Sequence, residues 1–353
     1  MKILFDHQIF AYQEIGGVSR YFCEIMKHIP KEMWYTSVSL SNNVYLKELQ
    51  VPHKPFLENI NFYKKGRVML ELGKIHSSKV IKQGDFDVLH LTHYESYANN
   101  KTNKPIVLTY HDKLFHSFEY NKRTIREQKR CFERADAVVA ISHNTKKDLI
   151  DYFDYPEEKI HVIYHGVANN LSVEKPIFDF DYVLFVGRRG RYKNFENFLY
   201  AFAKLDAKDL RLVCTAGDFT REELNLIKQL NLSGRVVHKF ASDRDLNALY
   251  QNAVFFVFPS KYEGFGMPLL EAMANKCPVL CSNNSAFPEV AGDAAVYFNA
   301  DDVDSIVYAM EKVYNSQAVR NDLINKGLER VKEFTWEKSA ARHLEVYKSL
   351  IEC

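Results

Sequence analysis

The feature that most constrains the fold is a regular alternation of short apolar runs, rich in β-branched residues, with segments of helical periodicity. In the first half the runs are KILF, TSVSL, DVLHLT, PIVLTY, AVVAIS and HVIYHG, and a helical pattern starts near Gly17. In the second half they are YVLFVG, LRLVCTAG, RVVHKF, VFFVFPS, CPVLCS and AAVYFN. Continuous apolar strands separated by helices are typical of parallel sheets that helices cover on both faces. We therefore predict an α/β protein with doubly wound, Rossmann-like sheets.

The length of the chain, 353 residues, exceeds that of one ordinary domain. The alternation is interrupted over residues 167–181, VANNLSVEKPIFDFD, which are polar and have no helical period, and this stretch is expected to link two domains. We expect a first domain over residues 1–170, a second over residues 171–335, and an amphipathic C-terminal helix over residues 336–353 that packs back on the first domain. Strands of both domains would end at a common cleft, where doubly wound sheets bind their ligands.

Charge and hydropathy exclude several classes of protein. The formal net charge of +2 and the pI near 8.1 are too mild for a nucleic-acid-binding surface. The N-terminal apolar run is broken by Asp6, and nothing later approaches 18 uninterrupted apolar residues. We expect a cytoplasmic protein without a signal peptide or membrane anchor.

The first domain offers a glycine pair and a histidine at the ends of its strands. Gly16 and Gly17 follow the first strand and directly precede a helix. Such a pair lets a phosphate approach the backbone N–H groups with the helix dipole behind them. His111 follows the strand PIVLTY, where an imidazole could hydrogen-bond a substrate or pass a proton near neutral pH. The alternatives are a plain tight turn and a structural histidine.

Two other ligands of this domain are not supported. The sequence has no G-x-G-x-x-G fingerprint and no acidic residue at the end of the second strand, so a nicotinamide cofactor is not expected. His90, His93 and His116 lie near His111 along the chain, but no Cys or carboxylate cluster has the spacing of a zinc site.

The second domain has a cluster of cations after its first strand, YVLFVG. A turn between a strand and a helix that holds four cations suggests a polyanion such as a diphosphate, for which Arg offers a planar fork and Lys a point charge. Ordinary surface charge is the alternative. The four residues are Arg188, Arg189, Arg191 and Lys193.

Two Asp-Phe-Asp triplets, residues 85–87 and 179–181, match the D-x-D pattern with which many sugar-transferring enzymes hold Mg²⁺ or Mn²⁺. Each triplet precedes its strand and is therefore expected at the amino end of the sheet, away from the cleft. We expect no metal at either triplet.

The stretch KYEGFGMPLLEAMANKCP, residues 261–278, carries Glu263 and Glu271 on either side of a Gly-Phe-Gly turn. Pro268 is expected at the first position of a helix. The N–H groups of residues 264–267 can bind phosphate or hydroxyl oxygens, and a carboxylate with two acceptor oxygens suits a vicinal diol. A nucleotide sugar presents both chemistries, since it has a diphosphate for the cations and sugar hydroxyls for the acids.

This stretch, extended by AMANKCPVLCSNNSAFPEVAGDAAVYFNADD, resembles the signature of the retaining GT-B glycosyltransferases of the large family numbered four. The resemblance includes GGVSRYF, TYHD, AISHNTKKDLI, VIYHGV, VGRRGRYKN and LYQNAVFFVFPS, so it covers the whole chain. It implies the GT-B fold, in which two Rossmann-like domains face a central cleft. His165 is a departure, since the family usually has Asn before Gly-Val.

The resemblance also implies roles for individual residues. Glu271 would bind the ribose diol and Glu263 would face the donor sugar. Arg188 and Lys193 would hold the diphosphate and stabilise it as it leaves. The other donor-binding positions would be Gly16, Gly17, Gly264, Phe265, Gly266 and Met267, and the catalytic positions would be His111, Glu263, Arg188 and Lys193.

The implied reaction is the transfer of a hexose, with retention of configuration, from GDP-mannose or a UDP-hexose to a glycan or lipid-linked glycan in the synthesis of a surface polysaccharide. No metal cofactor is required for it. An epimerase of the same fold, which needs no separate acceptor, and a nucleotide-sugar-binding subunit without catalysis are the alternatives.

Residues 62–82 of the first domain mix apolar side chains with six cations. Such a segment can dock on an anionic membrane, where a lipid-linked acceptor would be met. An ordinary solvated helix fits the same pattern, and both interpretations stay open.

Overall fold

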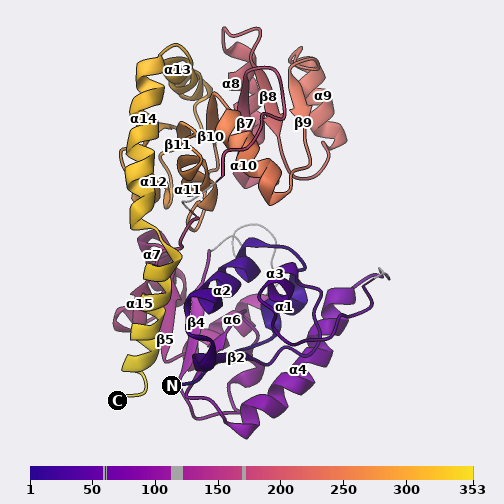
Figure 1. Cartoon of the computed structure of the whole chain (residues 1–353), viewed down its shortest axis with the longest axis vertical. Helices are drawn as coiled ribbons and strands as arrows, with labels where there is room; N and C mark the ends of the chain where they lie inside the picture. The colour runs from indigo at the N-terminus through magenta and orange to yellow at the C-terminus, as the bar shows by residue number, and fades with distance from the viewer. Residues whose placement is uncertain (59, 61, 113–121, 169–171, 353) are drawn as a thin grey trace. The chain divides into compact units, whose positions relative to one another are not determined.

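The computed structural model describes every residue except 59, 61, 113–121, 169–171 and 353. The chain divides into two compact units, which are here called unit 1 and unit 2. Unit 1 consists of Met1–Gly166 and Trp336–Cys353, and unit 2 of Val167–Thr335. Each unit has one six-stranded sheet in which all neighbouring strands are parallel, so the predicted doubly wound α/β fold is confirmed (Figure 1).

The sheet of unit 1 has the order β2-β1-β3-β4-β5-β6. Its central strands are buried along their whole length, as expected where helices cover both faces. The strand order reverses between β1 and β3, which is the switch point of this sheet. The strands are β1 Ile3–Phe5, β2 Trp34–Thr36, β3 Val88–Leu91, β4 Ile106–Tyr110, β5 Ala137–Ala140 and β6 Ile160–Val162.

The second strand lies earlier than predicted. The apolar run TSVSL indicated a strand over residues 36–40, whereas β2 ends at Thr36. Beyond it the Ser37 hydroxyl bonds to the Ser77 hydroxyl at 2.6 Å, and Leu40 forms an isolated bridge with Lys54. Ser37 N still donates to Phe5 O of β1 at 3.0 Å, whereas Ser39 and Ser41 bond to Lys54.

The helices of unit 1 include the C-terminal α15, whose buried residues recur at helical spacing and which packs against α2. The α-helices are α1 Gln8–Tyr12, α2 Gly17–His28, α3 Val44–Glu48, α4 Lys65–Gln83, α6 Lys122–Arg134, α7 His143–Phe153 and α15 Trp336–Ser349. Three 3₁₀-helices are η1 Lys31–Met33, η2 Ser96–Ala98 and η3 Glu157–Lys159.

The sheet of unit 2 has the order β12-β11-β10-β7-β8-β9, which is the doubly wound order 3-2-1-4-5-6 of dinucleotide-binding folds read from its far edge. Its switch point lies between β7 and β10. The strands are β7 Tyr182–Phe185, β8 Arg211–Cys214, β9 Val236–His238, β10 Phe255–Phe258, β11 Val279–Ser282 and β12 Ala295–Phe298. The helices are α8 Phe195–Lys204, α9 Arg221–Gln229, α10 Asp243–Asn252, α11 Met267–Ala274, α12 Phe287–Ala291, α13 Val303–Tyr314, α14 Gln317–Arg330, η4 Arg191–Lys193 and η5 Val331–Glu333.

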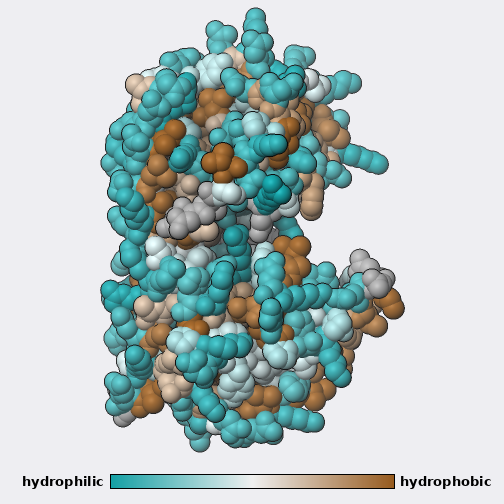
Figure 2. Space-filling model, in the orientation of Figure 1, coloured by the Kyte–Doolittle hydropathy of each residue, from teal (hydrophilic) through white to brown (hydrophobic). Residues whose placement is uncertain are grey.

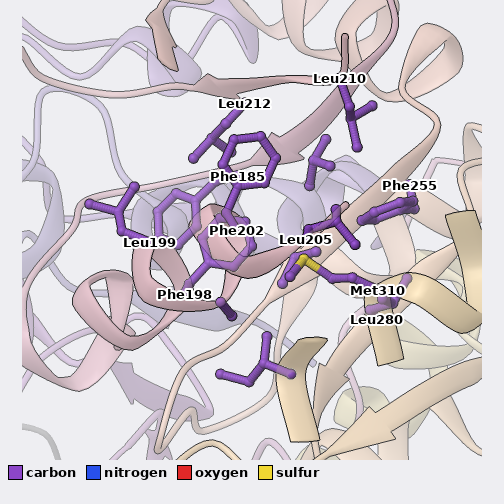
Figure 3. Packing of buried hydrophobic residues seen from close by; sticks show 14 of the residues in the cluster. Phe185, Phe198, Leu199, Phe202, Leu205, Leu210, Leu212, Phe255, Leu280 and Met310 are labelled. Atoms are coloured by element: carbon purple, nitrogen blue, oxygen red, sulfur yellow. The ribbon is translucent and has the colours of Figure 1, made fainter. Parts of the chain in front are cut away.

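Aromatic packing fixes the start of unit 2 (Figure 3). The Phe185 ring of β7 lies 5.0 Å from the Phe195 ring and stacks at 6.0 Å on the Phe198 ring, both on α8. All three rings are buried, and each such side chain contributes about 1.5–3 kcal/mol on burial. The two ends of the loop between β7 and α8 are therefore joined by buried aromatic packing.

Within the described part of the chain, no helix has the length and apolar character needed to cross a bilayer.

Candidate functional site

The loops that follow β7, β10 and β11 in unit 2 are held to one another by hydrogen bonds. Lys261 N, after β10, donates to Tyr192 O in the β7 loop at 2.7 Å. Glu263 N donates to the Ser285 hydroxyl at 3.1 Å, in the loop that follows β11. Because these strands are neighbours in the sheet, the three loops form one continuous rim at the carboxyl side of the switch point, where doubly wound sheets bind ligands.

An ion pair lies at the switch point. Lys193 Nζ is 2.6 Å from Glu263 Oε1, and the two side chains are only 12% and 15% exposed. The ammonium also lies 4.8 Å from the centre of the Phe258 ring at the end of β10. Asn194 follows in a left-handed conformation, which its amide fixes by donating to Ala300 O at 2.6 Å. The structure thus brings together two predicted site residues that are 70 positions apart.

The N-terminus of α11 opens into the same rim. Gly266 precedes the helix at φ 105°, and no side chain caps it. A Cβ at Gly266 would lie 2.9 Å from Cε1 of Phe287, so both conformation and space require glycine. Within the described residues, nothing accepts a hydrogen bond from the N–H of Gly266 or Met267. Pro268 occupies the second helical position rather than the predicted first, since α11 begins at Met267.

Glu271 lies one turn further along α11 and is partly buried. Its negative charge, together with the larger effect of burial, holds the pKa of Tyr250 well above its usual value. The Glu271 carboxylate therefore lies close enough to Tyr250 for its charge to act on the Tyr250 hydroxyl.

Arg188 and Arg189, two of the predicted cations, have different surroundings. Arg188 is exposed, and within the described residues it has no ion-pair partner. Arg189 instead holds the protein together, because it pairs with Glu223 at 3.1 Å and donates to the carbonyl oxygens of Thr215, Gly217 and Asp218. The expectation that Arg189 faces a polyanion is therefore wrong. The side chain of Arg191 lies outside the described residues.

In unit 1, the glycine pair stands at the start of α2, with Gly16 as N-cap. Gln13 partly occupies this helix end, because its Oε1 accepts from Ser19 N at 3.0 Å. A Cβ at Gly16 would lie 2.4 Å from the same oxygen, whereas a Cβ at Gly17 would meet nothing within 4 Å. The glutamine cap was not predicted, since only the resulting contact distinguishes Gln13 from other polar loop residues.

His111 follows β4 and is buried. Burial, with a smaller effect from His93, lowers the pKa of His111 to about 3. The imidazole is thus neutral near pH 7, so it can donate or accept a hydrogen bond. The sequence had suggested that it could also pass a proton near neutral pH, and its lowered pKa disfavours that role. Its Nε2 is buried and has no partner among the described residues.

The two Asp-Phe-Asp triplets stand at the amino ends of β3 and β7, as predicted. Asp87 Oδ2 accepts from Lys2 N at 2.7 Å, so one triplet stabilises the start of β1. In the described ranges, no group of three or more His, Cys, Asp or Glu has an arrangement that could hold a metal ion. His116 belongs to the residues that the structure does not describe.

Comparison with known proteins connects this geometry to sugar transfer. Residues 171–330 match the family model "Glycosyl transferases group 1", and residues 15–170 match "Glycosyltransferase Family 4". O-antigen chain mannosyltransferase B of Escherichia coli is 25% identical over an alignment of 387 positions, gaps included, that covers 99% of this chain and 100% of that protein. Serotype-specific mannosyltransferase WbdA of Escherichia coli is 30% identical over 241 residues, 63% of this chain but only 30% of that longer protein.

Among solved structures, Anabaena Alr3699/HepE in complex with UDP and glucose has a TM-score of 0.82 at 16% identity, covering 99% of this chain and 100% of the other. Sucrose-phosphate synthase from Thermosynechococcus elongatus has a TM-score of 0.80 at 18% identity and full coverage of both chains. These likenesses concern the fold, and they agree with the GT-B architecture that the motifs implied.

Proposed function

The chain belongs to the retaining group 1 glycosyltransferases of family 4, and from this premise we propose that unit 2 binds the nucleotide sugar and unit 1 the acceptor. The enzyme transfers a hexosyl group from a nucleotide sugar to a glycan, as its family does. The observation that carries the placement of the donor is the pair of Lys193 and Glu263 beside the uncapped N-terminus of α11.

The leaving diphosphate gains negative charge as the bond to the sugar breaks. Lys193, Arg188 and the N–H groups of Gly266 and Met267 would stabilise that charge, because aimed donors in a preorganised site lower the barrier where charge develops. Glu263 would bind donor-sugar hydroxyls with the carboxylate that now pairs with Lys193, and Glu271 would bind the ribose diol. His111, as a neutral imidazole, would offer a hydrogen bond to the transferred sugar.

Cations that belong to the chain would replace a divalent metal. We therefore expect activity to survive exhaustive treatment with EDTA, and Asp87→Asn and Asp179→Asn to transfer at the rate of the wild type. Loss of transfer in EDTA, restored by Mg²⁺ or Mn²⁺, would overturn this part of the proposal.

The sugar is proposed to be mannose. Both relatives described above are mannosyltransferases by name, and one is an O-antigen chain enzyme. By this argument GDP-mannose is the first donor to test, a UDP-hexose the second, and the acceptor is a surface glycan, free or lipid-linked.

An experiment on the donor tests the function. Purified protein is incubated with a panel of labelled GDP- and UDP-sugars, with and without a polysaccharide precursor extract, and the released nucleotide and labelled products are measured. We expect turnover with one donor class that rises with acceptor. An epimerised nucleotide sugar formed without acceptor would favour the epimerase, and binding without turnover a non-catalytic subunit.

We also propose that α4 docks unit 1 on the cytoplasmic face of an anionic membrane. Over residues 64–83 the chain has six Lys or Arg and one acid, Glu71. Val68, Leu72 and Ile75 form an exposed stripe on α4, opposite its buried face, and hydrophobic side chains gather over this helix at the lower right of Figure 2. Apolar side chains flanked by cations are typical of helices that lie in a membrane interface.

Flotation with vesicles that contain anionic lipid tests this surface. Lys64, Arg67 and Lys79 are exposed, whereas Lys65 donates to Leu57 O at 2.8 Å and is left unchanged. We expect the triple change of these three exposed cations to Glu to abolish flotation while donor hydrolysis continues. The matched control changes three exposed lysines elsewhere and should float as the wild type does: Lys228, Lys312 and Lys348→Glu. Equal flotation of both variants would contradict the proposal.

A further inference from the structure

Buried polar side chains join α15 to the sheet of unit 1 through a continuous series of hydrogen bonds, here called the α15 network. His343 Nε2 on α15 lies 2.8 Å from the Tyr21 hydroxyl of α2, which lies 3.2 Å from Thr109 Oγ1 of β4. Thr109 Oγ1 lies 2.9 Å from Nε2 of His90 on β3, and His90 Nδ1 lies 2.6 Å from the Tyr347 hydroxyl. The α15 network thus begins at His343 on α15 and ends at Tyr347, one turn later on the same helix.

The direction of each hydrogen bond follows from the chemistry of the groups. Ser339 O accepts at 2.7 Å from His343 Nδ1, so Nδ1 carries the proton of the neutral ring and Nε2 is an acceptor. Tyr21 therefore donates its only hydroxyl proton to His343. It follows that the Thr109 hydroxyl donates to the Tyr21 hydroxyl and accepts from its other partner, His90 Nε2.

Donors and acceptors in the rest of the α15 network are assigned in the same way. His90 Nε2 donates to Thr109, so His90 Nδ1 accepts from the Tyr347 hydroxyl. Both rings must be neutral for this order, and their burial agrees with it. Burial lowers the pKa of His343 to about 4 and, with His343 and His111 nearby, keeps the pKa of His90 well below its usual value. Each hydroxyl and imidazole proton of the α15 network thus has one defined donor and one defined acceptor.

Tyr21, in the middle of the α15 network, also packs against the His111 ring. The His111 ring meets the Tyr21 ring edge to face at 5.0 Å and 89°. On its other contacts, Tyr21 stacks on His165 at 4.7 Å, and His165 lies 6.0 Å from His111. Tyr21 therefore ties α15 to the candidate catalytic imidazole.

No hydrogen bond to the ring of His111 is made by any residue that the structure describes. Its backbone N donates to the Tyr94 hydroxyl at 3.2 Å, which fixes the main chain, but its buried Nε2 has no partner there. Among the described residues, the imidazole is therefore held by the rings around it, and of these the Tyr21 ring is the nearest at 5.0 Å.

We propose that His343 is a positioning residue for His111, because it accepts the Tyr21 hydroxyl proton and so fixes the ring that orients the imidazole. The importance of this for catalysis rests on the proposed function. Its geometry does not, since it concerns contacts within unit 1.

The first test needs no substrate. In protein with isotope-labelled histidine, the imidazole signals of His111 are assigned by comparison with His111→Gln. We expect His343→Leu, which cannot accept the proton, and Tyr21→Phe, which keeps the ring but lacks the hydroxyl, to shift these signals. His343→Gln, whose side-chain oxygen can accept from Tyr21, should leave them near their wild-type positions. The matched control is Arg342→Leu, at an exposed position of the same helix.

The second test uses transfer. We expect His343→Leu to lower kcat about 10-fold with the donor KM unchanged, since a small displacement of a catalytic group is costly to the chemical step. His343→Gln should restore most of kcat. In a His111→Ala background, His343→Leu should have no further effect on kcat, because residues that act through one another are not additive.

Unshifted His111 signals in folded His343→Leu and Tyr21→Phe would overturn the proposal. Independent, multiplicative losses of kcat for His111→Ala and His343→Leu would overturn it as well. A wild type that transfers from no nucleotide sugar would instead refute the proposed function, and the signals of His111 would still decide the positioning role.

Discussion

Lys193 and Glu263 form an ion pair at 2.6 Å. A charge pair that is mostly withdrawn from water is preorganised, because neither side chain has to be ordered when the donor binds. A diphosphate would compete for the ammonium and release the carboxylate toward the sugar hydroxyls. Under the proposed function, this one ion pair would prepare both halves of the donor contact.

Lys193→Ala tests this argument. We expect kcat to fall on the order of 10²–10³-fold, the usual effect of removing one aimed donor to developing charge, while the melting temperature changes little. Lys261→Ala is the matched control, since this lysine, in the neighbouring loop after β10, is exposed and pairs with the exposed Asp301. Equal kcat values for the two variants would remove Lys193 from the transition state.

Glu271→Ala tests the ribose contact. We expect the affinity for the donor and for the free nucleotide to weaken together, by about 1–3 kcal/mol, because the diol would lose its partly buried acceptor. Titration calorimetry with both ligands measures this. Unchanged affinity for the free nucleotide would place Glu271 outside the nucleotide site.

Individual side chains show where sequence reasoning stops. Motif and spacing indicated Lys193 and Glu263 as site residues. The sequence did not predict their ion pair, because this contact depends on β7 and β10 being neighbours in the sheet. Arg188 and Arg189 are adjacent and chemically identical, yet only Arg189 turns inward to Glu223. Tertiary packing decides which of the two arginines stays exposed.

At the scale of elements, apolar runs were a reliable signal and their ends were not. Each predicted run contains or overlaps a strand, because a strand buried on both faces needs continuous apolar residues. β2 is displaced since Trp34, buried and donating to Ile29 O at 3.3 Å, anchors it earlier than the run suggested. The short α1 carries too few residues to show a period.

The entrance of α11 gives a prediction at this scale. Gly266→Ala should lower the free energy of unfolding by about 1–3 kcal/mol, because φ 105° is strained for alanine and its Cβ would meet Phe287. Gly17→Ala, at the entrance of α2, has open space and should unfold as the wild type does. Denaturant titration compares the two. A stable Gly266→Ala would mean that the loop adapts, and the preorganised N-terminus would lose its support.

At the scale of the whole molecule, the chain passes between units at Gly166 and again at Thr335, so unit 1 contains both ends of the chain. The interruption at residues 167–181 signals the first crossing. The second has no such signal, since α14, η5 and α15 follow one another closely. The helical period of α15 predicts a buried face but not its partners on α2 and β3.

Buried neutral histidines make the stability of unit 1 depend on pH. Burial lowers the pKa of His111 to about 3 and the pKa values of His93 and His343 to about 4, whereas an unfolded chain has histidine pKa values near 6.5. Between about pH 4 and 6.5 the unfolded state therefore binds more protons than the folded state. The free energy of unfolding must rise with pH in this window and level off above it.

Urea denaturation from pH 5 to 8, followed by tryptophan fluorescence, measures this dependence selectively. The two tryptophans, Trp34 and Trp336, both belong to unit 1, so their emission reports the unfolding of that unit. Each neutral histidine adds a slope of up to about 1.4 kcal/mol per pH unit below about pH 6. His343→Gln keeps an acceptor for Tyr21 but cannot titrate, so its slope should be lower by about that amount while its stability at pH 8 stays close to the wild type. A slope that His343→Gln leaves unchanged would mean that His343 is not held neutral, and the proton order between α15 and the sheet would have to be reversed.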